Sequence, residues 1–287
     1  MVVGSNPTRS ITSNTISNNN NNNSSNITNS KYMCVFFDIY NIRKDLQKLA
    51  DPEKAKVLKR FFKTDPGQYG EGDIFQGINV PELRKAAKKY GNQDIPLQEV
   101  RMLLCSPIHE ERFLALLILI EMFRCADNKE KINNITTFYL NNLRWVNNWD
   151  LVDLSAPSIL GAFLMQKEHN KSILYKLARS ANVWERRIAI VATLCFIRNN
   201  QFNDTLKIAE ILLRDDHDLI HKAAGWMLRE VGKRDICAEE IFLNKHSRIM
   251  PNTMLRYAIE RLPENKRQAY YYMLKRSLLS HPNNIMT

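Results

Sequence analysis

The segment Asn147-Asn-Trp-Asp-Leu-Val-Asp153 combines residue types and spacing that could do chemistry. Trp149 and Asp153 are four residues apart, so in a helix they share one face. An indole face attracts a cation, and a carboxylate stabilises positive charge and can hold a water molecule. The pair therefore suits the stabilisation of a cation, with a structural ion pair for Asp153 as the alternative. If one of the two Asn residues caps this helix, Asp150 lies in the first turn, where its charge stabilises the positive end of the helix dipole. This structural role is sufficient to explain Asp150.

A second pattern lies in the segment 219–232. Helical spacing places Lys222, Trp226, Arg229 and Lys233 on one stripe. Core packing would explain the tryptophan but not the three cations beside it. A surface that meets a phosphate backbone explains both, so we interpret the stripe as a nucleic-acid contact.

Other kinds of site find little support. The six histidines are scattered, and only His217 and His221 share a helical face, so we expect no metal and no cofactor. No Ser or Cys nucleophile with a partnered His is visible. Five cysteines without a Cys-x-x-Cys pair indicate buried free thiols. The segment 67–77 holds four of the nine glycines but lacks the Lys-Ser/Thr of a phosphate-binding loop, which predicts a loop of fixed shape.

Composition limits the class of protein. A chain of 287 residues with 44% hydrophobic residues can bury a core. Residues 1–31 contain Arg9, Lys31 and no acid, so +9 of the net charge of +11 lies in the rest, which favours DNA or RNA as partner over a merely solvated basic surface. The longest apolar run, 113–120, is far shorter than the roughly 20 residues of a membrane span. We expect a nuclear or cytoplasmic protein that is not secreted and binds no membrane.

The elements that position these residues are predicted to be helices. Residues 1–30 include ten Asn and predict a disordered arm, and 31–287 predict one helical-repeat domain. Small residues recur in similar apolar contexts at spacings of 41, 33, 35 and 34, at Ala115, Ala156, Ala189, Ala224 and Ala258. This period predicts an all-α fold, an α-solenoid with a basic concave face, rather than an irregular bundle. The expected helices cover about 79–90, 99–105, 109–125, 129–142, 149–165, 170–179, 183–198, 203–213, 218–232, 236–243, 252–261 and 264–278.

Five blocks in this order resemble the DNA alkylation repair enzyme family, the AlkD-like DNA glycosylases built from HEAT-like repeats. The resemblance spans roughly residues 50–280. The blocks are Gly67-Gln-Tyr-Gly-Glu-Gly-Asp73, Ile108-His-Glu-Glu-Arg112, Asn148-Trp-Asp-Leu-Val-Asp-Leu-Ser-Ala-Pro157, Trp184-Glu-Arg-Arg-Ile-Ala189 and Ile220-His-Lys-Ala-Ala-Gly-Trp-Met-Leu-Arg-Glu230.

The resemblance implies hydrolysis of the N-glycosidic bond of cationic N3- and N7-alkylpurines in duplex DNA by a monomer. It implies that Asp153 is the catalytic carboxylate, that Trp149 and Trp226 flank the damaged nucleotide, and that Arg187 contacts a phosphate. It also implies that Tyr69 lies near the lesion, and that the lesion stays exposed instead of entering a deep pocket.

Further contacts and alternative functions remain open at this point. Lys85, Lys88 and Lys89, on the helix after Pro81, would extend the DNA contact, or they form an ordinary solvated face. A solenoid that binds nucleic acid without catalysis would bind in a salt-sensitive way and release no base. A helical scaffold for a protein partner would bind a peptide through its tryptophans.

Overall fold

The computed structural model describes residues 39–91, 95–166 and 170–280. The predicted arm, 1–30, and the first residues of the predicted domain lie outside the described residues. Within those ranges all regular secondary structure is helical, apart from one isolated bridge between Ile74 and Ile108. A first helix covers 39–48. It is followed by α2 (Pro52–Phe61), α3 (Val80–Gly91), α4 (Leu97–Leu104), α5 (His109–Cys125), α6 (Lys129–Asn141), α7 (Trp149–Ser155), α8 (Ala162–Leu164), α9 (Ser172–Leu177), α10 (Val183–Ala192), α11 (Leu194–Arg198), α12 (Asn203–Ile211), α13 (Asp218–Gly232), α14 (Ile236–His246), α15 (Asn252–Ala258) and α16 (Glu264–Ser280).

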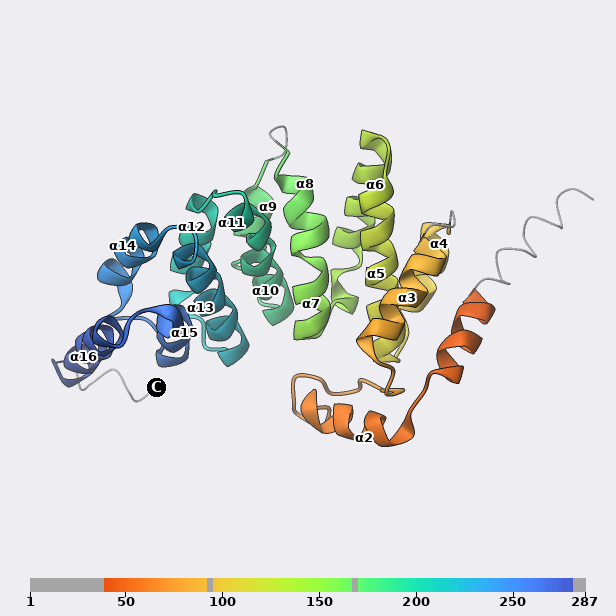
Figure 1. Cartoon of the computed structure of the whole chain (residues 1–287), viewed down its shortest axis with the longest axis horizontal. Coiled ribbons are helices and arrows are strands. Elements are labelled where there is room, and N and C mark those ends of the chain that lie inside the picture. Colours follow the sequence, from red (N-terminus) through yellow and green to blue (C-terminus); the bar gives the residue numbers. More distant parts are fainter. Residues whose placement is uncertain (1–38, 92–94, 167–169, 281–287) are drawn as a thin grey trace, which may run out of the picture.

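The helices stand side by side in a row that runs from α3 and α4 to α16 (Figure 1). The recurring small residues mark the layers of this row, because Ala115, Ala156, Ala189, Ala224 and Ala258 are each at most 1% exposed. Each helix pair therefore buries its apolar stripe against its neighbours, as in a solenoid. The predicted all-α helical-repeat fold is confirmed.

Some element boundaries differ from the expectation. The helix expected over 149–165 is interrupted by a π turn, Pro157–Gly161, because Pro157 has no N–H and the Gly161 N–H bonds to Ala156 O. The helices before residue 79 were not predicted. The cysteines also differ, since Cys125 and Cys237 are exposed free thiols rather than buried ones.

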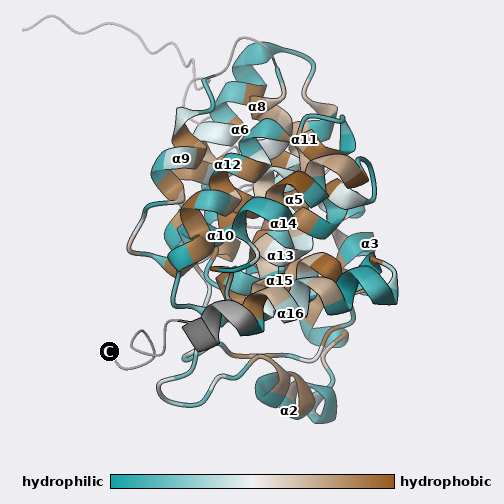
Figure 2. Ribbon diagram, turned by 90° about the vertical axis from the view of Figure 1, so that its left-hand side faces the viewer, coloured by the Kyte–Doolittle hydropathy of each residue, from teal (hydrophilic) through white to brown (hydrophobic). Residues whose placement is uncertain are grey.

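Helix α2 lies apart from the row, and none of its residues is buried (Figures 1 and 2). The side chain of Asp51 caps it by accepting hydrogen bonds from the N–H groups of Glu53 and Lys54. The glycine-rich segment then returns the chain to α3. Gly77 in this segment has a φ of 82°, and a Cβ atom there would overlap the carbonyl oxygen of Asp51. The close approach of the two backbones fixes how α2 leaves the solenoid.

Two glycines of this loop offer a matched test. Gly72 and Gly77 both have positive φ values, 85° and 82°, but a Cβ atom at Gly72 meets nothing within 4 Å. We expect Gly72→Ala to cost about 1 kcal/mol of unfolding free energy through backbone strain alone. Gly77→Ala should cost about 1–3 kcal/mol more, because the methyl group also clashes. Urea unfolding of the two variants measures the difference, and equal losses would contradict the close approach.

Candidate active site

Helix α7 carries the Trp149 and Asp153 pair. Asn148 begins the helix, and its side-chain oxygen accepts the N–H of Trp149 at 2.8 Å. The Asp153 side chain is 21% exposed, and Trp149 is half-buried. Both side chains line the same cavity, so they share the face that their spacing predicts and neither is sealed in the core.

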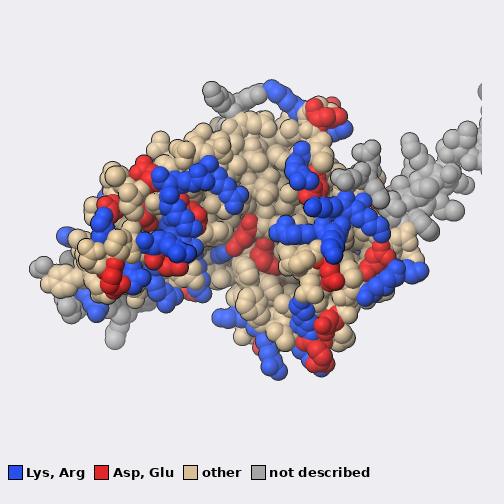
Figure 3. Space-filling view, in the orientation of Figure 1, with Lys and Arg blue, Asp and Glu red and all other residues tan. Residues whose placement is uncertain are grey.

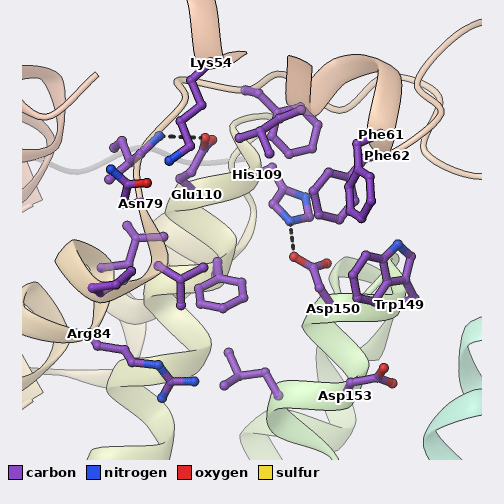
Figure 4. Close-up of a pocket in the computed structure, with 18 residues that line it drawn as sticks. Lys54, Phe61, Phe62, Asn79, Arg84, His109, Glu110, Trp149, Asp150 and Asp153 are labelled. Carbon is purple, nitrogen blue, oxygen red and sulfur yellow. Dashed lines mark hydrogen bonds and ion pairs between the residues drawn. The ribbon is translucent and has the colours of Figure 1, made fainter. Parts of the chain in front are cut away.

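The cavity has a volume of about 670 Å³ and lies between α2, α3, α5 and α7 (Figure 4). Its walls are largely apolar and aromatic. They include Phe61, Phe62, Phe75, Leu83, Phe113 and Leu154. Lys54 and Arg84 supply cationic side chains from α2 and α3. The site thus combines one apolar space with a carboxylate at its edge.

Arg187 holds the Asp153 carboxylate from the neighbouring helix α10. Its Nε donates to Asp153 Oδ1 at 2.9 Å, and its Nη2 donates to Oδ2 at 2.8 Å. The third nitrogen, Nη1, donates to the carbonyl of Leu219 at 2.7 Å, in the first turn of α13. Burial raises the pKa of Asp153, while the charge and hydrogen bonds of Arg187 oppose that shift. The bidentate pair fixes the carboxylate orientation.

Two phenylalanines of α2 and its end pack on Trp149. The ring of Phe62 stacks on the indole with centroids 5.3 Å apart, and Phe61 meets it edge-on at 5.9 Å. Phe61 is 61% exposed, although it is a large apolar side chain. Sequence reasoning missed both residues. The adjacent aromatics at the end of a basic helix were the available signal.

His109 bridges the glycine-rich loop and the start of α7. Its Nδ1 lies 3.0 Å from Asp73 Oδ2, and its Nε2 lies 2.8 Å from Asp150 Oδ2 (Figure 4). Burial alone would lower the pKa of His109, but the hydrogen bonds to the two carboxylates raise it to about 9. His109 is therefore protonated at neutral pH. Asp150, which needed no role beyond its first-turn position in the sequence, is in fact a partner of this histidine.

Further bonds fix the same loop from the starts of α5 and α7. Arg112 Nη2 donates to Asp73 Oδ1 at 2.5 Å, and Asn148 Nδ2 donates to Asp73 Oδ2 at 3.1 Å. The buried carboxylate of Glu110 accepts backbone N–H groups of the loop, at 2.8 Å from Gly77. The residues His109 to Arg112 thus hold the cavity wall in place.

The cations of the α13 stripe are paired with acids. Lys222 lies 2.6 Å from Asp218, Lys233 lies 2.6 Å from Glu230, and Arg229 pairs with Glu260. The Trp226 indole donates to Glu230 Oε1 at 3.1 Å. Trp226 does not line the described cavity; its helix reaches the site through Leu219 and Arg187. The stripe exists, but these acids reduce its net charge.

The other predicted contact residues do not line the cavity beside Asp153. Tyr69 packs edge-on against Trp184 of α10, with centroids 6.2 Å apart, and does not line the described cavity. Lys85 and Lys88 are exposed on α3. Lys89, also on α3, forms an ion pair with Asp45 of the first helix, with 2.7 Å between Nζ and Oδ2.

Charged groups are unevenly distributed on the face seen in Figure 3. Lys and Arg atoms gather on both sides of a central area that contains Asp and Glu atoms. Among the described residues, no three His, Cys, Asp or Glu side chains are grouped to hold a metal ion. No helix within the described ranges has the length and apolar character that crossing a bilayer requires.

The fold and site define a helical-repeat protein with a carboxylate at the edge of a largely apolar cavity. A family model described as DNA alkylation repair enzyme matches residues 42–262, and the chain belongs to this family. A solved structure described as a predicted DNA alkylation repair enzyme from Enterococcus faecalis is similar, at 18% identity and a TM-score of 0.61, over 75% of this chain and 97% of that one. AlkD2 from Streptococcus mutans gives 15% identity and a TM-score of 0.42, over 84% and 97%. No curated protein matches the chain.

The bridge through His109 predicts a pH-dependent stability. The folded-state pKa of about 9 exceeds the unfolded value of about 6.5, so the stabilisation is complete below about pH 6.5 and is lost as the pH rises through about 9. We expect His109→Gln to cost about 3 kcal/mol at pH 6, because it breaks a buried charged pair, and less at pH 9.5. Urea unfolding of both proteins across this range measures the difference.

His217→Gln is the matched control. Burial lowers the pKa of His217, so its titration lies below about pH 6.5 and should leave its difference from wild type flat above that pH. A flat difference for His109→Gln as well would contradict a charged bridge.

Proposed function

We propose that this protein hydrolyses the N-glycosidic bond of cationic N3- and N7-alkylpurines in duplex DNA and releases the damaged base. The observation that carries the proposal is the Asp153 carboxylate, held in a bidentate pair by Arg187 and placed beside Trp149 at the edge of a cavity. Membership of the DNA alkylation repair enzyme family supports the choice of substrate.

The chemistry requires little from the protein at the leaving group. Alkylation at N3 or N7 already makes the purine positively charged, so it departs with the electrons of the C1′–N bond without a strong general acid. The sugar becomes oxocarbenium-like, and Asp153 stabilises this charge. Water, oriented by the carboxylate, then adds to C1′ on the side that Asp153 faces, and the proton that it loses passes to solvent. The products are the free base and an abasic site.

In this scheme the main role of Arg187 is to orient the Asp153 carboxylate. Three of its nitrogens already donate to Asp153 and to the Leu219 carbonyl, and its side chain is 6% exposed. It is a positioning residue that keeps Asp153 turned toward the sugar. A contact with a DNA phosphate would use the N–H groups that remain on Nη1 and Nη2.

The remaining sequence-based assignments complete the proposal. Trp149 and Trp226 flank the damaged nucleotide, and Tyr69 approaches it from the glycine-rich loop. Phosphates of the duplex meet the predicted cations of α3 and of the α13 stripe, and the protein acts as a monomer without a cofactor. The contacts with phosphates make binding dependent on salt.

Asp153→Asn tests the assignment. The amide keeps the size of the side chain but loses its negative charge, so release of 7-methylguanine from methylated duplex DNA should fall by at least about 100-fold. Binding of the same DNA should change little. Chromatography of the freed bases measures the loss under single-turnover conditions.

Asp215→Asn is a matched control for the lost ion pair. Asp215 is also held by an arginine, with Arg186 Nε 2.6 Å from its Oδ2, and it does not line the Asp153 cavity. This variant should lose similar stability and keep full base release. Undiminished release by Asp153→Asn would reject the catalytic assignment, and no release by the wild type would favour a solenoid that only binds nucleic acid.

A further inference from the structure

An arginine recurs at one position of the helical repeat. In four successive helix pairs, it lies in the turn between the first and the second helix. The spacings along the chain are 35, 35 and 34 residues, which is the period of the solenoid. We call the set the arginine rim, and its members are Arg144, Arg179, Arg214 and Arg248. The common position predicts that each of these repeats presents one guanidinium group at the same edge of the stack.

Contacts between the second helices show that their starts lie side by side. These helices are α7, α10, α13 and α15, and each begins four or five residues after a rim arginine. Arg187 of α10 binds Asp153 of α7 and the carbonyl group of Leu219 in α13. The side chain of Thr253 in α15 forms a hydrogen bond with Asp218, the first residue of α13. The turns that carry the four arginines therefore follow one edge of the molecule.

The candidate active site lies at the same edge. Trp149, the first residue of α7, lines the cavity beside Asp153, and α2 lines it too. In Figure 1, α7 begins at the end of the row that lies toward α2. Packed helices are about 8–10 Å apart, so the arginine rim extends for roughly 25–30 Å from Arg144 toward α16. That length covers several phosphates of a duplex, in which each strand carries one per ~3.4 Å of axis.

The rim arginines are exposed and lack acidic partners. None of the four forms an ion pair with another residue of the described ranges. Arg144 lies over the ring of Trp145, and Arg179 donates one hydrogen bond to the carbonyl group of Tyr175 at 2.9 Å. A guanidinium group has five N–H donors, so most of them remain free to bind a ligand. The cations of the α13 stripe differ, because each of them is paired with an acid.

Acidic side chains are scarce in the turns of the arginine rim. The turns 142–148, 178–182 and 247–251 contain no Asp or Glu. In the fourth turn, 212–217, Asp215 is held by Arg186 at 2.6 Å, and Asp216 is exposed. Positive charge is therefore uncompensated in three of the four turns and faces one exposed acid in the fourth.

Regularly spaced cations are complementary to a partner whose negative charge is also repeated. The phosphate backbone of DNA is such a partner, and a guanidinium group can donate two hydrogen bonds to one phosphate. We propose that the arginine rim binds backbone phosphates of duplex DNA beyond the lesion. The inference deepens the proposed function and rests on it for the choice of DNA as partner. It assigns DNA binding to the turns between helices, in addition to the helix faces of α3 and α13.

Two double variants separate the arginine rim from the rest of the basic surface. Arg179→Gln with Arg214→Gln removes two neighbouring rim charges, whose side chains line one cavity of about 550 Å³. Arg198→Gln with Arg234→Gln is the matched control. These two arginines are exposed at or just after the far ends of α11 and α13, roughly 20 Å along the helices from the rim. Because each double variant replaces two exposed arginines, both should fold, and both lose the same net charge.

Binding of an undamaged, fluorescently labelled duplex is measured by anisotropy at several salt concentrations. Each lost phosphate contact reduces the slope of log affinity against log salt by about 0.9, so the rim variant should lose about 1.8. Its affinity at ~0.1 M salt should fall by at least about tenfold. The control variant should keep the wild-type slope and stay within about twofold in affinity, because salt screens charges that lie far from the DNA.

Arg179→Lys with Arg214→Lys should restore the slope, because counterion release depends on charge rather than on the shape of the side chain. Equal slopes for the rim and control variants, or no restoration by the lysines, would overturn the inference. Since the duplex is undamaged, these results do not depend on catalysis. Wild-type protein that binds through the rim but releases no base from methylated DNA would reject the proposed function instead.

Discussion

The protonated side chain of His109 connects two of the segments that line the cavity, the glycine-rich loop and α7. It lies between Asp73 in the glycine-rich loop and Asp150 in the first turn of α7, at 3.0 and 2.8 Å. Asp150 is next to Trp149 and less than one helical turn before Asp153, so the bridge sets the register of the site helix against the loop. Arg112 donates to the second oxygen of Asp73, so two positive side chains face two carboxylates. This pairing offsets the free-energy cost of burying the charges.

The Asp153 carboxylate, at the edge of the cavity, is held by an arginine of the neighbouring helix α10. Arg187 joins Asp153 to α10 and, through the Leu219 carbonyl, to the start of α13. Successive repeats of the solenoid thereby converge on one carboxylate. This arrangement explains how a fold made of repeated helix pairs can fix the orientation of one carboxylate, since α10 supplies the arginine and α13 supplies the carbonyl that holds the arginine.

The position of α2 gives the site its depth. The concave wall of a solenoid is open, and here a helix without buried residues lies apart from the row and contributes Lys54, Leu58 and Phe61 to the cavity. The loop that carries this helix is fixed by Glu110, Asp73 and the close approach at Gly77. The buried polar residues at the start of α5 therefore help to fix the shape of the cavity.

The sequence by itself determined the helical repeat, the recurring buried alanines and the shared face of Trp149 and Asp153, because helical periodicity is local. It also indicated the family, through blocks such as those around Asp153 and Trp226. Only the tertiary structure decided that His109 pairs with Asp73 and Asp150, that Glu260 pairs with Arg229 of α13, and that Phe61 and Phe62 pack on Trp149. These contacts join residues up to 88 positions apart (Phe61 and Trp149), and no pattern along the chain specifies which distant groups meet.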